Sequence, residues 1–580
     1  MNHFTKIIKI FDKSDKKKLA FLTVQLIIGA FFELIGITLF LPLIQVLISD
    51  DTTQSVIWSF FPKTCASMDV NKKIVFLCVL MIAIYIVKNL FLAFSLFYQY
   101  KFIYDFQNRT RTLLLKRYLE KPYLFHTQNN SADMNRSLTS DVYNFSDYLI
   151  GIVQMISEGI VSIVLVLFLA YSDIVITLVI LGLLAAISVC YFIPTRKRLI
   201  KNGADNQKAY SDFVKCMNQS WGSIKEIKMQ KREDYFTNIF FQASSRYAET
   251  KRKVQFLSAF PRFMMESVVI VGFALAIIIR VMLGGNIVEM VSNLSVFAVA
   301  AYRLMPSVNR INAYYGMVSY NKASVDLVYK DLEDCKTMDR QSQTKICAPD
   351  CPNEHNITIS GISFKYPEAD HYVLKNINMS IEIGKSVGII GKTGAGKTTL
   401  VDILLGLLKP DTGCVRYNGI DTQKNKDEWL KKVGYIPQKI YILDDTIRNN
   451  IAFGLPKEEI DDEQIWEALR EAQMDQFVNQ LEYGLDTTVG ECGARLSGGQ
   501  CQRLGIARVL FKRPEIIVMD ESTSALDNET EKAVMESIEN LHGKVTLIII
   551  AHRLTTVQKC DYIYEVCDGN VIQRQRDELI

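Results

Sequence analysis

The sequence predicts a membrane α-helical domain followed by an α/β domain with a mainly parallel central sheet. Three observations support this prediction. Long apolar runs cluster in the first 320 residues, a polar stretch with two prolines follows at 331–352, and short β-rich runs alternate with helical stretches from about residue 353. We therefore expect a transmembrane domain at 1–330, a linker at 331–352 and an α/β domain at 353–580.

Six apolar runs in the first part are each long enough to cross a bilayer as a helix, which takes roughly 20 residues. The alternative is a large buried helical core. It is disfavoured because the stretches after Ile174 and around Val269 are apolar on all faces rather than on one stripe. The sequence thus predicts six transmembrane helices, at about 19–48, 74–100, 149–171, 174–193, 256–283 and 287–316.

Lysine and arginine residues predict the orientation of these spans. They are frequent before the first span and in the segments 101–147 and 194–255, whereas the alternate loops 49–73, 172–173 and 284–286 hold few. Because basic segments stay on the cytoplasmic side, both termini and both long basic segments should be cytoplasmic. This bias accounts for the basic residues of a chain whose net charge is +4, so we expect no nucleic-acid partner. The first apolar run is too long for a cleavable signal peptide.

A glycine-rich loop predicts the chemistry of the α/β domain. Gly391–Thr398 fits G-x-x-x-x-G-K-T, follows the strand-like run Val387–Ile390 and opens a helix. Its glycines let backbone N–H groups approach phosphates, and the helix N-terminus adds a favourable dipole. We expect ATP here, with Lys397 at the β- and γ-phosphates and Thr398 on Mg²⁺. The expected nucleotide-binding residues are Gly391, Lys392, Thr393, Gly394, Ala395, Gly396, Lys397, Thr398 and Thr399.

Two further motifs extend this reading. Ile516–Asp520 is an apolar run that ends in a carboxylate, which is expected to hold Mg²⁺, and Glu521 follows it. Leu496–Gln500 has the sequence LSGGQ. Together with the glycine-rich loop, these motifs resemble the ATP-binding-cassette (ABC) ATPases. The resemblance implies that Glu521 activates the attacking water, so the site should be competent for hydrolysis.

The same resemblance implies roles for other single residues. Tyr366 would stack on adenine, Gln438 would sense Mg²⁺ and the γ-phosphate, and His552 would contact the γ-phosphate. Asp527 would lie in the loop that couples two ATP sites. The expected catalytic residues are therefore Glu521, His552 and Gln438, and the expected Mg²⁺ ligands are Thr398, Gln438 and Asp520.

The LSGGQ motif also predicts assembly. In the family that it resembles, Ser497, Gly499 and Gln500 would act on the ATP of the opposite subunit. Because the chain carries one such motif and one phosphate loop, the working unit should be a dimer, most simply a homodimer. Six spans before one ATPase is the layout of half-size exporters, which implies that 101–147 and 194–255 are helical extensions ending in coupling helices. Thr487–Gly493 resembles the exporter element T-E-V-G-E-R-G, with Thr488 and Cys492 replacing Glu and Arg.

Charged residues inside the spans are the candidates for substrate contacts, because each costs roughly 2.5–3.5 kcal/mol to insert. Arg303 and Arg310 are seven residues apart and share a helix face, and Arg262 should lie near the cytoplasmic end of its span. Arginine suits a phosphate ligand. We expect these residues and Lys88 to contact substrate. Internal pairing, of Arg262 with Glu266 and of Lys88 with Glu33, remains the alternative.

Ser295–Ile311 resembles the sixth span of PglK-type flippases, which move polyprenyl-diphosphate-linked oligosaccharides across a bacterial membrane. The resemblance implies an ATP-driven flippase in the bacterial cytoplasmic (inner) membrane, with the lipid-linked oligosaccharide as substrate and ATP and Mg²⁺ as cofactors. Three alternatives remain. They are a multidrug or lipid A exporter with a more apolar cavity, a peptide exporter, and an ATP-gated channel or regulator.

Overall fold

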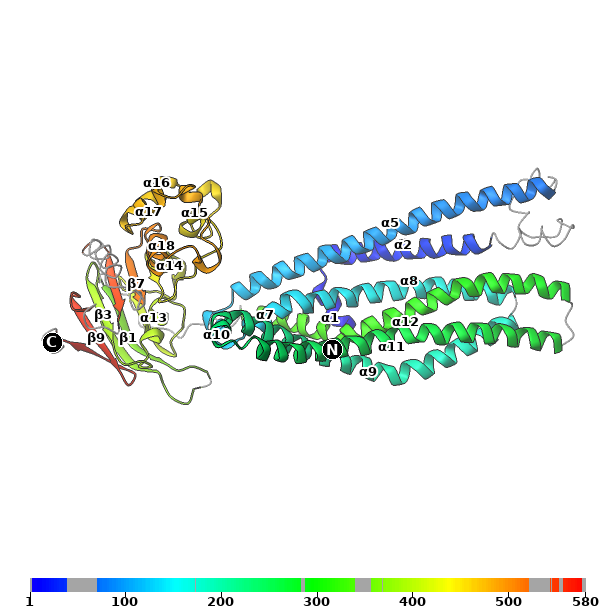
Figure 1. Cartoon of the computed structure of the whole chain (residues 1–580), viewed down its shortest axis with the longest axis horizontal. Coiled ribbons are helices and arrows are strands. Elements are labelled where there is room, and N and C mark those ends of the chain that lie inside the picture. Colours follow the sequence, from blue (N-terminus) through cyan, green and yellow to red (C-terminus); the bar gives the residue numbers. More distant parts are fainter. Residues whose placement is uncertain are drawn as a thin grey trace. The chain divides into compact units, whose positions relative to one another are not determined.

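The computed structural model describes residues 3–38, 70–172, 174–282, 287–338, 356–367, 369–520, 543, 545–551 and 557–575. The chain divides into two compact units. The first comprises Met1–Lys121 and Gln128–Ser342, and the second comprises Pro122–Thr127 and Gln343–Ile580. Figure 1 shows that the described part of the first unit consists of helices, whereas the second is built around β-sheets.

The first unit contains long helices joined by short ones. Its elements are α1 (His3–Ile10), α2 (Lys13–Thr38), α5 (Val70–Leu119), α7 (Ser131–Arg136), the π-helical turn η2 (Ser137–Asp141), α8 (Val142–Ser172), α9 (Ile174–Gly222), α10 (Ile224–Gln230), α11 (Glu233–Met282) and α12 (Ile287–Met338). The helices α5, α9, α11 and α12 have 49 to 52 residues each. A bilayer needs roughly 20 residues, so each of these helices extends well beyond it. The helical extensions that were expected in the two basic segments are confirmed.

Three stretches of the described chain are both long enough and apolar enough to cross a membrane. They are Lys13–Gly36, Ile74–Leu119 and Ser131–Leu167. These stretches contain, wholly or in part, the first three predicted spans. The other three predicted spans lie in α9, α11 and α12, except for residue 283, which is outside the described residues.

Helix α12 packs against α8, α9 and α11, and glycines allow the close approach. A Cβ atom on Gly151 of α8 would lie 2.7 Å from Cγ2 of Val318. A Cβ atom on Gly203 of α9 would overlap the backbone carbonyl oxygen of Tyr320. The N-terminal helix α1 joins the same packing, because its Ile7 is buried in a cluster with residues of α5, α8 and α12.

The second unit contains two sheets. A four-stranded sheet has the order β2-β1-β4-β5, and a six-stranded sheet has the order β10-β9-β3-β8-β7-β6. Strands β9, β3, β8, β7 and β6 are parallel, and β10 pairs antiparallel with β9 at the edge. The strands are β1 (Asn356–Phe364), β2 (Leu374–Glu382), β3 (Ser386–Ile390), β4 (Thr412–Tyr417), β5 (Ile420–Asp421), β6 (Val433–Ile436), β7 (Ile516–Asp520), β8 (Thr546–Ile550), β9 (Tyr562–Cys567) and β10 (Asn570–Arg574).

One hydrophobic core connects the two sheets of this unit. It includes Ile357 and Met379 from the smaller sheet, Val387 and Val518 from the larger one, and Leu400 from helix α13. Among the described residues, the helices and turns of the unit are α6 (Tyr123–Gln128), α13 (Lys397–Leu404), α14 (Lys426–Lys432), α15 (Ile447–Ile451), η3 (Lys457–Glu459), α16 (Asp462–Glu471), α17 (Asp475–Asn479), η4 (Gly484–Asp486), η5 (Glu491–Gly493) and α18 (Gly498–Leu510). The mainly parallel central sheet was predicted, whereas the antiparallel sheet was not.

The segment that was expected to be a linker begins as a helix. Helix α12 continues to Met338, eight residues into the expected linker 331–352. Tyr118 and Ser137 both donate hydrogen bonds of 2.8 Å to Asp331 Oδ2, so this part of the helix is fixed against α5 and η2. Residues 339–355 lie outside the described residues.

Substitution of Gly203 tests the approach of α9 to α12. The new methyl group of the Gly203→Ala variant would force the two helices apart, and such overpacking costs about 1–3 kcal/mol. We expect a lower melting temperature for this variant, measured on the full chain in detergent. Gly159→Ala in α8 is the matched control, because a Cβ atom there meets no atom within 4 Å. Equal melting temperatures of the Gly203→Ala variant and the wild type would contradict the close approach.

Candidate functional site

The parallel strands bring the predicted motifs to one edge of the larger sheet. Strand β3 ends at Ile390, directly before the glycine-rich loop, and β7 ends at Asp520. Ile436 of β6 pairs with Met519 of β7, so Gln438 follows β6 at the same edge. Ligands of open α/β sheets bind at this carboxyl edge. The predicted residues Glu521, Asp527 and His552 lie outside the described residues.

The glycine-rich loop is closed by its own lysine. Gly394 and Gly396 have φ values of 82° and 105°, which favour glycine. Lys397 is buried, and its ammonium donates hydrogen bonds to the backbone oxygens of Gly391 (2.8 Å) and Lys392 (3.2 Å). The loop therefore curls around a positive charge at the N-terminal end of α13, an arrangement that suits a phosphate.

Helix α13 also positions a threonine pair and the predicted aromatic residue. Thr398 is exposed in the first turn, whereas Thr399 is buried. The hydroxyl oxygens of Tyr366 and Thr399 are 3.2 Å apart, within hydrogen-bond distance. The Tyr366 ring also meets that of Phe364 edge to face, at 5.1 Å between centroids. Tyr366 thus lies beside the phosphate loop, and its stacking on adenine stays a prediction.

Asp520 has two neighbours that the sequence reasoning missed. Tyr435 donates a 3.5 Å hydrogen bond to Asp520 Oδ2. Asp402 of α13 is buried, and burial together with the negative charge of Asp520 raises its pKa from 3.8 to about 6. Burial, followed by the charges of Asp520 and Asp402, also raises the pKa of Tyr435. Asp402 follows the glycine-rich loop Gly391–Thr398 by four residues, and Tyr435 precedes Gln438 by three.

The side chains at this edge fit Mg²⁺. The Thr398 hydroxyl, the Asp520 carboxylate and the Gln438 amide supply oxygen atoms, the donor type that Mg²⁺ prefers. Among the described residues no three His, Cys, Asp or Glu side chains gather to form a metal site. One carboxylate is sufficient here, because Mg²⁺ in nucleotide sites is commonly held by one or two carboxylates together with phosphate and water.

The LSGGQ motif starts helix α18 with a reciprocal cap. The Ser497 hydroxyl accepts a hydrogen bond from the Gln500 backbone N–H at 3.2 Å, and the Ser497 N–H donates to Gln500 Oε1 at 2.8 Å. Ser497 and Gly498 are exposed, and a Cβ atom on Gly498 would meet no atom within 4 Å. Gln500 therefore shapes the helix start, and the start itself is exposed at Ser497 and Gly498.

Three of the four predicted substrate residues have described side chains, and each pairs with a carboxylate. Lys88 of α5 lies 2.8 Å from Glu33 of α2 and 4.7 Å from the centroid of the Tyr85 ring. Arg262 lies 3.0 Å from Glu266, and Arg310 of α12 lies 2.8 Å from Glu158 of α8. The side chain of Arg303 is outside the described part.

These pairs differ in exposure. The Lys88 side chain is only 1% exposed, which makes it a structural cation between α2 and α5. The side chains of Arg262 and Arg310 are 69% and 54% exposed, so both remain accessible while paired. The sequence left internal pairing open as the alternative for two of these residues, and the structure pairs Arg262 with Glu266 and Lys88 with Glu33. The partner of Arg310 was missed because it lies on another helix.

Replacement of Asp402 tests the buried carboxylate pair. The raised pKa means that the folded chain binds this proton more tightly than the unfolded chain, so ionisation destabilises the fold. The cost is absent below about pH 4, grows as the pH rises and is complete above about pH 6. Asp520, Tyr435 and Tyr123 are the titratable groups that interact with Asp402.

Asp402→Asn removes this charge and should stabilise the fold by roughly 1–2 kcal/mol at pH 8 and by about half as much at pH 5. Thermal unfolding of the nucleotide-free full chain in EDTA measures both values. The variant Asp444→Asn, at an exposed position, should melt close to the wild type at both pH values. A gain for Asp402→Asn that is the same at pH 5 and pH 8 would show that the raised pKa is wrong.

Comparisons with known proteins agree with this arrangement. The family described as the ABC transporter transmembrane region matches residues 19–301, and the family described as ABC transporter matches residues 374–524. The chain is similar to the ATP-dependent lipid A-core flippase of Francisella tularensis subsp. tularensis (strain SCHU S4 / Schu 4), with 28% identity over 488 residues, which cover 82% of this chain and 77% of that protein. The flippase of the same name from Coxiella burnetii (strain RSA 493 / Nine Mile phase I) is 28% identical over 479 residues, 80% of this chain and 78% of that protein.

A solved structure shows the same fold. A bacterial Atm1-family ABC exporter with ATP bound has a TM-score of 0.73 and 20% identity, and the match covers 98% of this chain and 96% of that one. The predicted fold class and the predicted ATPase are therefore confirmed. The chain belongs to the ABC transporters, as an exporter-type half-transporter whose ATPase domain couples ATP hydrolysis to transport.

Proposed function

We propose that this chain acts as a homodimer in a bacterial cytoplasmic membrane and flips a polyprenyl-diphosphate-linked oligosaccharide from the cytoplasmic to the outer leaflet. The observation that carries the flippase part is the similarity, over about four fifths of the chain, to flippases of a lipid. The exposed guanidinium groups of Arg262 and Arg310 support a diphosphate headgroup as the ligand, because one guanidinium can donate two parallel hydrogen bonds to the oxygens of a phosphate.

The ATPase roles in this proposal come from the motifs of the sequence and from the resemblance to ABC ATPases. Lys397 and the loop N–H groups bind the phosphates of ATP, with Thr398, Asp520 and Gln438 around the Mg²⁺ that neutralises them. Glu521 activates water and His552 contacts the γ-phosphate. The exposed start of α18, with Ser497 and Gly499, completes the ATP site of the second chain, and Asp527 couples the two sites. ATP binding would then bias the transporter toward one conformation, and hydrolysis would reset it.

Helix α6 is the proposed coupling element. It follows α5 after three residues, yet Pro122–Thr127 groups with the α/β domain. Leu124 packs against the hydrophobic core of that domain. Burial, followed by the charges of Asp402 and Tyr366, raises the pKa of Tyr123. A helix continuous in sequence with a long span and packed beside the ATP site is well placed to transmit closure.

Lipid A-core is the second candidate substrate, because the relatives carry that name. Reconstituted chain in proteoliposomes separates the candidates. Fluorescent polyprenyl-diphosphate oligosaccharide should be flipped with ATP, and lipid A-core, phospholipid and a cationic drug should be flipped more slowly. Faster flipping of lipid A-core would replace the first candidate by the second. ATP-dependent movement of none of these lipids would overturn the flippase proposal.

Replacement of Glu521 tests the general base. Glu521→Gln keeps the shape of the side chain but cannot accept a proton, so hydrolysis should fall by about 10²–10⁴-fold while ATP still binds. Steady-state turnover and nucleotide binding to the purified full chain measure the two quantities. Normal turnover in this variant would contradict the assignment.

Removal of two arginines tests the substrate contacts. Arg303→Ala combined with Arg310→Ala should abolish flipping of the diphosphate lipid while basal ATPase activity persists, because both residues share one face of α12. Glu158→Gln is the matched control, since it removes the partner of Arg310 and keeps the arginine. If Glu158→Gln reduces flipping as much as the double variant, Arg310 is only a structural partner. Undiminished flipping by the double variant would contradict a charged substrate path.

A further inference from the structure

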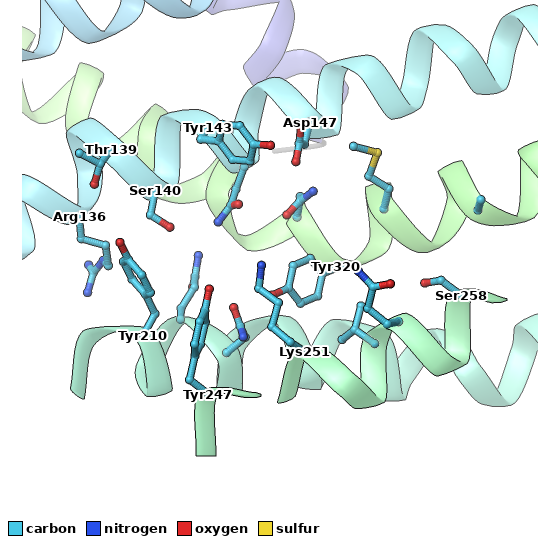
Figure 2. A pocket seen from close by; sticks show the side chains of 18 of the residues that line it. Arg136, Thr139, Ser140, Tyr143, Asp147, Tyr210, Tyr247, Lys251, Ser258 and Tyr320 are labelled. Atoms are coloured by element: carbon cyan, nitrogen blue, oxygen red, sulfur yellow. The ribbon is translucent and has the colours of Figure 1, made fainter. Parts of the chain in front are cut away.

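The first unit contains a cavity with a volume of about 610 Å³, which lies within the usual range for small-ligand sites of about 300–1,000 Å³. Its walls come from η2 and α8 on one side and from α9 and α11 on the other, with residues of α12 between them, and Arg111 of α5 and Arg136 of α7 also line it. Figure 2 shows side chains from the two walls pointing toward one another, including Asp147 of α8 and Lys251 of α11. The cavity lies outside the ATP site and contains none of the predicted substrate residues.

Close helix contacts hold the cavity walls in place. Tyr320 lines the cavity, and its backbone oxygen fills the space over Gly203 of α9. A Cβ atom on Gly316 of α12 would lie 3.0 Å from the hydroxyl of Ser258, another lining residue on α11. The walls are therefore fixed by backbone packing rather than by long side chains alone, which favours a preformed site.

The cavity lining includes a guanidinium group that lacks a hydrogen-bond partner at one of its nitrogen atoms among the described residues. The buried Nε of Arg111 has no hydrogen-bond partner among the described residues, and one Nη of this side chain donates a long 3.4 Å bond to the Thr139 oxygen. Arg136 differs, because Asp133 and Asp141 lie 2.9 Å and 3.3 Å from its guanidinium nitrogens. The lining thus carries three cations, Arg111, Arg136 and Lys251, and one carboxylate, Asp147, while the two carboxylates that pair with Arg136 are not lining residues.

Aromatic and amide groups form the rest of the binding surface. The rings of Tyr210 and Tyr247 lie 5.5 Å apart, and the Lys251 ammonium lies 5.6 Å from the Tyr247 centroid. Tyr143 and the amides of Asn144 and Gln207 also line the cavity. Aromatic faces pack on the C–H face of a sugar ring, and amides and phenol hydroxyls hydrogen-bond its hydroxyls. An apolar drug would leave these polar groups without partners.

We infer that this cavity binds a phosphorylated sugar within each single chain. Arg111 and Lys251 bind the phosphate, the tyrosines and amides bind the ring, and Asp147 accepts hydrogen bonds from ring hydroxyls. The lipid-linked form of this inference rests on the proposed function. Ala313 at the cavity lies one helical turn beyond Arg310 on α12, so a headgroup leaving the cavity would next meet that arginine.

Two sources of a phosphorylated sugar share this chemistry, namely a lipid headgroup and a soluble sugar phosphate. Calorimetry with N-acetylglucosamine 1-phosphate on the full chain in detergent tests the cavity itself. We expect binding to the wild type and about tenfold or greater weakening in Lys251→Gln and in Tyr247→Ala. Lys253→Gln is the matched control on the same helix, because Lys253 pairs with Glu249 and does not line the cavity.

Flipping of the diphosphate lipid by the same variants tests the source. A KM for lipid that rises about tenfold in Lys251→Gln, with Lys253→Gln normal, supports a headgroup site. Sugar phosphate binding that depends on Lys251, without any lipid flipping by the wild type, supports a soluble ligand and overturns only the proposed function. Lipid flipping that Lys251→Gln leaves unchanged, together with sugar phosphate binding that is absent or unaffected, overturns the cavity inference and leaves the proposed function standing.

Discussion

A charge that the fold removes from water must find a partner, and this requirement organises both units of the chain. In the membrane unit Lys88 is fully buried, so Glu33 must lie within 2.8 Å of it, which fixes α2 against α5. In the α/β unit the ammonium of Lys397 is held by the carbonyl oxygens of its own loop, and this curls the loop into a phosphate cradle. Asp402 is the exception: it is buried beside a second carboxylate, and its raised pKa records the cost.

The same requirement separates structural charges from those that can serve transport. A buried pair such as Lys88 with Glu33 loses several kcal/mol if one partner leaves, so it holds its geometry. The pair of Arg262 with Glu266 is exposed on both sides, whereas the pair of Arg310 with Glu158 joins a half-exposed arginine to a carboxylate that is only 12% exposed. An anionic headgroup can approach the exposed side of the Arg310 guanidinium while Glu158 stays in place. A cation that pairs with a carboxylate in the absence of substrate can still bind substrate if its side chain is exposed. Exposure therefore distinguishes Arg262 and Arg310 from the buried Lys88.

Local patterns made much of the fold and the ATP site predictable. The loop Gly391–Thr398, the strand that ends at Asp520 and the LSGGQ motif are each encoded within about ten residues, so local sequence patterns and family resemblance indicated them. The features that were missed depend on contacts between distant segments. Glu158 and Arg310 lie on different helices, Asp402 meets Asp520 only once β7 is in the sheet, and the antiparallel sheet depends on pairing across long loops. The cavity is lined by seven helical elements, and no single stretch of sequence carries its pattern.

The cavity would also link substrate binding to conformation. Its phosphate and ring contacts come from opposite walls, Asp147 and Tyr143 on α8 and Lys251 and Tyr247 on α11. A motion that separates these walls must break contacts to a bound ligand, so the ligand stabilises the state in which they are close. Linkage is reciprocal, so a second ligand that favours this state tightens binding in the cavity by the same factor by which the cavity ligand tightens binding of the second ligand. If ATP binding separates the walls, it weakens the hold on the headgroup at the step that moves it onward. The cavity would then act as a loading site that releases its ligand when the ATPase domains close.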